Sequence, residues 1–236
     1  MNLKDRIIVA LDVHDLEEVK PWVETLSPYV GCFKVGLELA TAAGAPQVVK
    51  TIHQLGGEVF LDCKFHDIPN TMAGAARSAA RLGVKMFNVH ASSGEEGMRA
   101  AARVKGQSIL LAVTVLTSIA EEACHAIYRT SVAERVKDFA RQALASGMDG
   151  IVCSPQDLED LYSDPDLRRL ITVTPGVRPL WAEAQDQKRV FTPREAVRAG
   201  ATALVIGRPI THPPRNIGSP VDAVRRILDE IAEGLE

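Results

Sequence analysis

Acidic and basic side chains alternate in a short stretch that begins at Asp62. Lys64 stands two residues later, and Asp67 follows after three more. Residues two apart on a strand project to the same side, so Asp62 and Lys64 are expected to share one crowded site, which Lys34 from a neighbouring strand can join. Alternating signs let each group stay ionised, whereas unpaired carboxylates this close would raise one another's pKa. An ordinary salt-bridge cluster is the competing interpretation, weakened because these charges end apolar strands, where burial is unfavourable unless a function retains it.

A second group of residues is typical of a phosphate site. Gly176 and Arg178 follow one apolar run, and Gly207 and Arg208 follow the next. Loops after the last two strands of many barrels hold phosphate through backbone N–H groups and a bidentate guanidinium. This pattern indicates a phosphorylated small molecule and says nothing about the reaction.

Other classes of function are disfavoured by composition. The 27 basic and 30 acidic residues give a net charge of −3 without a block of like charge, which argues against nucleic-acid binding or an electrostatic membrane anchor. No run approaches the roughly 20 apolar residues that span a bilayer. The 6 histidines show no metal-binding spacing, so hydrogen-bonded structural roles are expected for them. No cofactor motif is present, and the 4 cysteines without a CxxC pair favour a reduced, cytoplasmic compartment.

Short apolar runs alternate with amphipathic segments along the whole chain. The runs predict strands at residues 6–13, 32–37, 58–64, 86–91, 108–117, 150–154, 171–177 and 203–209. The amphipathic segments predict helices at 16–26, 47–55, 71–82, 94–104, 132–145, 156–161, 193–199 and 221–232. The proline-rich residues 211–220 are expected to form a rigid, non-helical loop.

Eight strand–helix units predict a single-domain (β/α)₈ TIM barrel over residues 1–236. An open doubly wound sheet is the runner-up, but the first turn, LDVHDLEE, lacks a glycine-rich phosphate loop. Active sites of barrels gather at the carboxyl ends of the strands. Those ends carry Asp12, Lys34, Asp62, Lys64, Thr117, Arg178 and Arg208.

The stretch from Asp62 to Thr71 resembles the D-x-K-x-x-D-I-P-N-T signature of the orotidine 5′-phosphate decarboxylases. Further similarities are ALD at 10–12, FKVGLEL at 33–39, AVTVLTS at 112–118, TPGVRP at 174–179, Gln187 and VIGRPIT at 205–211. They cover essentially the whole chain and suit the compact bacterial type. One departure is the long THPPRNIGSP segment at 211–220, where relatives often have a shorter link.

The resemblance implies a cofactor-free and metal-free decarboxylation of orotidine 5′-phosphate to uridine 5′-phosphate in pyrimidine biosynthesis. Lys64 would protonate C6 of the pyrimidine within a charged array of Lys34, Asp62, Lys64 and Asp67. Asp67 would reach into the partner's site of a homodimer. Asp12, Lys34 and Thr71 would hold the ribose, and Thr117 would contact the pyrimidine. The phosphate side of the nucleotide would be bound by Arg178, Gln187, Gly207 and Arg208.

Two other functions stay open. A sugar-phosphate decarboxylase of the 3-keto-gulonate 6-phosphate type, or an aldolase, would share D-x-K-x-x-D and use Mg²⁺, but is not expected to carry HDIPNT or Gln187. A non-catalytic nucleotide-binding barrel would keep the phosphate site and would not need four buried charges.

Overall fold

The computed structural model describes residues 2–182 and 191–236. Eight parallel strands follow one another around a closed barrel, so the predicted (β/α)₈ fold is confirmed. The open sheet is wrong, because the first strand pairs with both the second and the eighth. The strands are β1 (Ile7–Leu11), β2 (Cys32–Val35), β3 (Val59–Phe65), β4 (Met86–His90), β5 (Ile109–Val113), β6 (Gly150–Val152), β7 (Ile171–Thr174) and β8 (Ala203–Ile206).

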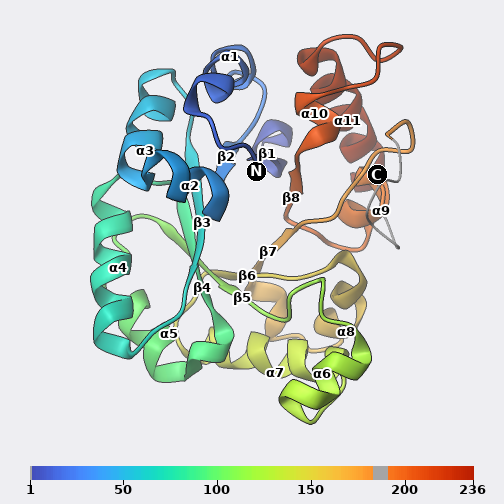
Figure 1. Cartoon of the computed structure of the whole chain (residues 1–236). Coiled ribbons are helices and arrows are strands. Elements are labelled where there is room, and N and C mark those ends of the chain that lie inside the picture. Colours follow the sequence, from blue (N-terminus) through green and yellow to red (C-terminus); the bar gives the residue numbers. More distant parts are fainter. Residues whose placement is uncertain (1, 183–190) are drawn as a thin grey trace. The chain divides into compact units, whose positions relative to one another are not determined.

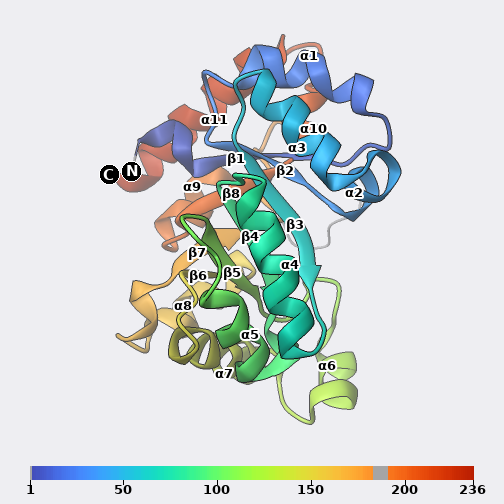
Figure 2. The same ribbon diagram turned by 90° about the vertical axis from the view of Figure 1, so that its left-hand side faces the viewer.

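Helices separate the strands along the chain (Figures 1 and 2). The α-helices are α1 (Leu16–Leu26), α2 (Leu37–Ala43), α3 (Ala45–Gln54), α4 (Pro69–Arg81), α5 (Gly94–Ala102), α6 (Glu121–Tyr128), α7 (Val132–Ala145), α8 (Leu158–Tyr162), α9 (Pro193–Arg198), α10 (Arg208–Thr211) and α11 (Pro220–Leu235). Short 3₁₀ turns are η1 (Leu3–Arg6), η2 (Ala91–Ser93), η3 (Pro155–Asp157) and η4 (Leu167–Arg169). In the described part of the chain, no helix is long and apolar enough to cross a membrane.

The chain divides into two compact units. One comprises Met1–Cys63 and Thr174–Glu236, and the other comprises Lys64–Val173, so the boundary lies inside β3. In the first unit α9 packs against α11. In the second unit α4 and α5 run side by side (Figure 2).

Burial on both faces explains the apolar composition of the strands. Every residue of β1 is buried, and Ile7, Ile8 and Leu11 are 0% exposed. Parallel strands covered by helices have no solvent-facing side, so they read as continuous apolar runs. Each such aliphatic side chain contributes roughly 1.5–3 kcal/mol on burial, which makes a charged residue in these strands unfavourable without a partner.

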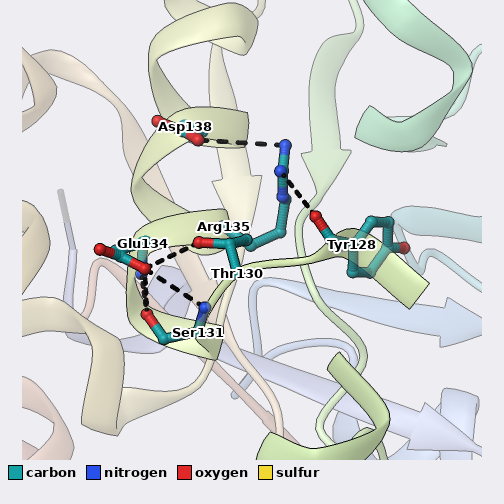
Figure 3. Close-up of polar contacts among 6 residues, drawn as sticks. All are labelled: Tyr128, Thr130, Ser131, Glu134, Arg135 and Asp138. Atoms are coloured by element: carbon teal, nitrogen blue, oxygen red, sulfur yellow. Dashed lines mark hydrogen bonds and ion pairs between the residues drawn. The ribbon is translucent and has the colours of Figure 1, made fainter. Parts of the chain in front are cut away.

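The start of α7 is fixed by a capping box (Figure 3). Ser131 Oγ donates to Glu134 Oε2 over 2.8 Å, and the Glu134 N–H donates to Ser131 Oγ over 3.3 Å. Thr130 Oγ1 donates to the same carboxylate over 2.7 Å. The Ser131 N–H also donates to Glu134 Oε2, over 3.3 Å, so the capping box satisfies two backbone N–H groups, those of Ser131 and Glu134. The buried face of α7 then repeats at helical spacing through Val136, Phe139, Ala140 and Ala143.

Arg135 ties α6 to α7. Its guanidinium donates to the Tyr128 carbonyl over 3.4 Å and lies 3.9 Å from the Asp138 carboxylate (Figure 3). It also lies 5.4 Å from the centre of the Tyr128 ring and 5.3 Å from that of Phe139. This cation–π contact holds the α6–α7 hairpin, which follows the segment that carries Thr117.

Three helices were not anticipated by the sequence pattern: α2, α6 and α10. They have 7, 8 and 4 residues, too few for a clear helical period. The strand predicted at 203–209 ends at Ile206, and Pro209 lies in the first turn of α10, where a missing N–H does no harm. The loop predicted at 211–220 is shorter at both ends: Thr211 closes α10, and Pro220 begins α11 behind a Ser219 cap.

The carboxyl of Asp157 gives the fold a specific dependence on pH. Burial raises the pKa of Asp157 to about 6, although the Ser154 N–H, which donates to the carboxylate over 2.8 Å, favours the charged form. A folded pKa above the unfolded value means that the folded state binds a proton more tightly. Its contribution to stability is therefore present at low pH and is lost as pH rises through about 6.

We predict that Asp157→Asn flattens the pH dependence of stability between about pH 4 and pH 6. The amide keeps an acceptor for the Ser154 N–H but does not titrate. Urea unfolding of both proteins at a series of pH values measures the difference, which cannot exceed about 1.4 kcal/mol per pH unit for one proton. Parallel stability curves for the two proteins would contradict the assignment.

Candidate active site

Strands β1, β2 and β3 bring three charged residues together. Lys34 Nζ lies 2.8 Å from Asp12 Oδ1 and 3.4 Å from Asp62 Oδ2. Lys34 pairs with Phe60 in the parallel register, and Asp62 lies two residues beyond Phe60, so both side chains leave the same face of the sheet. The expected proximity of Lys34 and Asp62 is thus found, with Asp12 as a third member.

The cluster keeps Lys34 charged. The side chains of Lys34 and Asp62 are only 12% and 11% exposed, whereas that of Asp12 is 62% exposed. Burial by itself would lower the pKa of Lys34, but Asp62 and Asp12 together outweigh it and the pKa is raised. The ammonium of Lys34 thus lies between two carboxylates, those of Asp12 and Asp62.

Gly36 leaves room for this ammonium. A Cβ at position 36 would stand 3.1 Å from Lys34 Nζ and 3.5 Å from Asp12 Oδ1. Any side chain here would press on the ion pair. The sequence reasoning missed this role of Gly36, although the residue lies within the FKVGLEL segment.

The expected phosphate-binding residues lie in the same unit as this cluster. Gly207 precedes α10, and a Cβ there would be 3.9 Å from Asp12 Oδ2, so the start of α10 lies beside Asp12. Arg208 is the first residue of α10 and is exposed. Arg178 is 8% exposed, and its backbone N–H donates to the Phe191 carbonyl over 2.9 Å. Gln187 lies outside the described residues.

Lys64 has an unusual backbone conformation at the end of β3. Its φ of 49° is in the left-handed region, which side chains with a Cβ rarely adopt. Simple strand alternation therefore does not hold through Lys64, and no residue pattern predicts this turn. The Lys64 N–H donates to Asn88 Oδ1 over 2.8 Å. The same strand joins Lys64 to Asp62, with only Cys63 between them.

His90, the last residue of β4, lies near Lys64. Burial lowers the pKa of His90, and the positive charges of His66 and Lys64 lower it further. Its Nδ1 accepts the Ser92 N–H over 3.3 Å and lies 2.7 Å from Ser92 Oγ. His90 is therefore hydrogen-bonded, as the sequence analysis expects of the histidines. Its ring meets that of His66 edge to face, with centroids 5.9 Å apart.

The residues after Lys64 form an exposed turn. Asp67 accepts the N–H of Ile68 over 2.6 Å, and the Ile68 side chain is 66% exposed. Pro69 begins α4, which places Thr71 on its first turn, exposed. Thr117 is also exposed, between β5 and α6. Asp67, Thr71 and Thr117 thus belong to the Lys64–Val173 unit, whereas Asp12, Lys34 and Asp62 belong to the other.

Metal ligation finds no support among the described side chains, where no group of three or more His, Cys, Asp or Glu residues could hold an ion. At the strand ends, the carboxylates of Asp12 and Asp62 both lie beside the ammonium of Lys34.

We predict that Lys64→Gly unfolds with a free energy about 1 kcal/mol larger than that of Lys64→Ala, because only glycine adopts the left-handed region without steric strain. Both variants lack the ammonium, so the comparison isolates the backbone. Urea unfolding provides the measurement.

The same pair of substitutions at Lys50, inside α3, serves as the control. There glycine should be the less stable variant by about 1 kcal/mol, because it disfavours helices. A Lys64→Gly variant that is less stable than Lys64→Ala would show that the turn is not strained.

Comparison with known proteins identifies the family. Residues 5–227 match the model of the orotidine 5′-phosphate decarboxylase / HUMPS family. The chain is 48% identical to an orotidine 5′-phosphate decarboxylase of Moorella thermoacetica, over 98% of this chain and 94% of the relative. It is also 48% identical to one of Geobacter sulfurreducens, over 98% of both. A crystal structure of the Lactobacillus acidophilus enzyme of that name has a TM-score of 0.80 and 34% identity, over 95% of this chain and 98% of that one. The chain therefore belongs to the orotidine 5′-phosphate decarboxylase / HUMPS family.

Proposed function

We propose that this protein decarboxylates orotidine 5′-phosphate to uridine 5′-phosphate without a cofactor. The observation that carries the proposal is the ammonium of Lys34 between the carboxylates of Asp12 and Asp62. Asp62 lies on β3, the strand that continues into Lys64 and the rest of the D-x-K-x-x-D-I-P-N-T signature. The eight curated relatives compared here, 46–48% identical, all bear the name orotidine 5′-phosphate decarboxylase.

The proposed reaction develops negative charge on C6 of the pyrimidine, which a nearby ammonium group can stabilise. The bond between C6 and the carboxylate breaks, CO₂ leaves, and the electron pair stays on C6 in the plane of the ring, where the π system cannot delocalise it. The ammonium of Lys64 stabilises that developing charge and then transfers a proton from its nitrogen to C6. Lys34 Nζ lies 3.4 Å from Asp62 Oδ2, and this ion pair holds the charged array in place.

The remaining site residues bind the rest of the nucleotide in this proposal. Asp12 and Lys34 hold the ribose hydroxyls, helped by Thr71, and Thr117 contacts the pyrimidine. Arg178, Gln187, Gly207 and Arg208 bind the phosphate side. Gly207 lies beside Asp12, which supports a ligand that reaches from the charged cluster to the start of α10.

A homodimer with Asp67 shared across the interface completes the proposal. Asp67 and Ile68 stand exposed on the turn before α4, with the Ile68 side chain 66% exposed. Both residues are therefore accessible to a second copy of the chain in this proposal. The described cysteines are all free thiols, which supports a reducing cytoplasmic location.

A sugar-phosphate decarboxylase or aldolase that uses Mg²⁺ is the alternative. Lys34 argues against it, because a divalent ion between Asp12 and Asp62 would have to displace the ammonium. Turnover of orotidylate measured with and without EDTA separates the two functions. Undiminished turnover in EDTA supports the proposal, whereas activity that requires added Mg²⁺ supports the alternative.

We predict that Lys64→Ala lowers kcat for orotidylate by about 10⁴-fold or more, because it removes the proton donor and the nearest positive charge. Turnover is followed by the absorbance change on decarboxylation. Affinity for uridine 5′-phosphate, measured by calorimetry, serves as the control for folding. A variant that keeps even a tenth of wild-type turnover would refute the role of Lys64.

We further predict that mixing Lys64→Ala with Asp67→Asn restores activity to about a quarter of wild type, although each variant alone is nearly inactive. After equal mixing about half of the dimers are mixed, and under two-fold symmetry one of their two sites contains both defects and the other contains neither. Mass spectrometry of intact dimers confirms subunit exchange. If exchange is complete and activity stays at the level of the single variants, Asp67 is not shared.

A further inference from the structure

The backbone at Lys64 requires a partner that a regular strand would not need. In a strand the N–H group is directed at the carbonyl of a neighbouring strand. At Lys64 the left-handed φ of 49° turns the chain that follows, and the N–H of this residue donates to a side chain. A conformation this unfavourable persists only where its surroundings determine it.

That side chain is Asn88, a polar residue inside an apolar strand. Its neighbours on β4 include Phe87 and Val89, both 0% exposed, and Asn88 itself is 1% exposed. It pairs with Leu111 of β5, so its backbone position is set by the parallel register. A buried amide is unfavourable unless it is hydrogen-bonded, and Oδ1 of Asn88 accepts the Lys64 N–H over 2.8 Å.

We propose that Asn88 is a positioning residue: its amide oxygen holds residue 64 in the left-handed turn and so places the Lys64 ammonium for proton transfer. The inference rests on the proposed catalytic role of Lys64. Asn88 does not need to touch the substrate, because it acts on the backbone from which the reactive side chain leaves.

The chemistry of asparagine suits this task. Its oxygen is a strong acceptor on a short, stiff side chain, so it fixes the position of one N–H closely. Unlike aspartate, asparagine adds no negative charge beside Lys64, whose ammonium interacts with the reacting carbon in the proposed mechanism. Displacement of a reacting group by about 1 Å lowers a rate by roughly 10²-fold.

The test compares four proteins. Asn88→Leu has a similar volume and no acceptor, whereas Asn88→Asp retains the acceptor. Asn88→Ser keeps a polar group that is too short to reach the Lys64 N–H, and stands in if Asn88→Leu does not fold. Ser108→Ala is the matched control: it removes a buried hydrogen bond in the same unit, from Ser108 Oγ to the Val84 carbonyl at 2.7 Å, just before β5.

We expect Asn88→Leu and Asn88→Ser to lower kcat for orotidylate by about 10²-fold, with KM and the affinity for uridine 5′-phosphate changed less than about threefold. Asn88→Asp should recover at least about tenfold of that loss, and Ser108→Ala should keep kcat within about threefold of wild type. An unchanged kcat in Asn88→Leu or in Asn88→Ser overturns the proposal. A loss of kcat in Asn88→Asp equal to the loss in those two variants also overturns it.

A crystal structure of Asn88→Leu, or of Asn88→Ser in its place, provides a readout that does not depend on the reaction. We expect φ of residue 64 to leave the left-handed region when the acceptor is removed. A φ that stays near 49° would show that Asn88 does not hold the turn. Absence of orotidylate turnover in the wild-type protein would instead refute the proposed function, while the φ of residue 64 would still decide the role of Asn88.

Discussion

The ammonium of Lys34 is the interaction on which the site depends. Asp62 is 8% exposed, and burial of a carboxylate without a cation beside it is unfavourable. Lys34 supplies that cation and is itself kept charged by Asp62 and Asp12. Removal of one member of a buried ion pair leaves an uncompensated charge and costs about 3–5 kcal/mol. Loss of Lys34 or of Asp62 would leave its partner as such a charge, whereas Asp12 is 62% exposed.

The fold provides this cluster through register alone. Asp12, Lys34 and Asp62 come from three successive strands, and a slip of one residue in β2 would turn Lys34 to the opposite face. Gly36 completes the arrangement by leaving space for the ammonium where any other residue would place a Cβ at 3.1 Å.

What the sequence could predict follows from how strongly each pattern constrains the chain. All eight strands were predictable because β-branched apolar runs between amphipathic segments have few alternatives, and Ser131 with Glu134 marks the start of α7 directly. The helices α2, α6 and α10 are too short to show a period. The closeness of Lys34 and Asp62 follows from strand order, whereas the left-handed turn at Lys64 has no signature, because lysine has no preference for it. Asn88 is visible in the sequence as the one amide in the apolar strand MFNVH. A polar residue in a strand does not by itself indicate its hydrogen-bond partner.

Lys64 and Asn88 each violate a local rule, and the violations compensate each other. Lys64 adopts a left-handed conformation that is unfavourable for a residue with a Cβ, at a point where its N–H donates to a side chain. An asparagine at 1% exposure in an apolar strand is, alone, a buried acceptor without a donor. The hydrogen bond between them satisfies both groups at once. Departures from local rules concentrate where function requires them, and these two meet at the residue to which the proposed mechanism assigns proton transfer. A sequence change at either position alone would disturb the other, so the pair constrains the strands β3 and β4 as tightly as the charges constrain β1, β2 and β3.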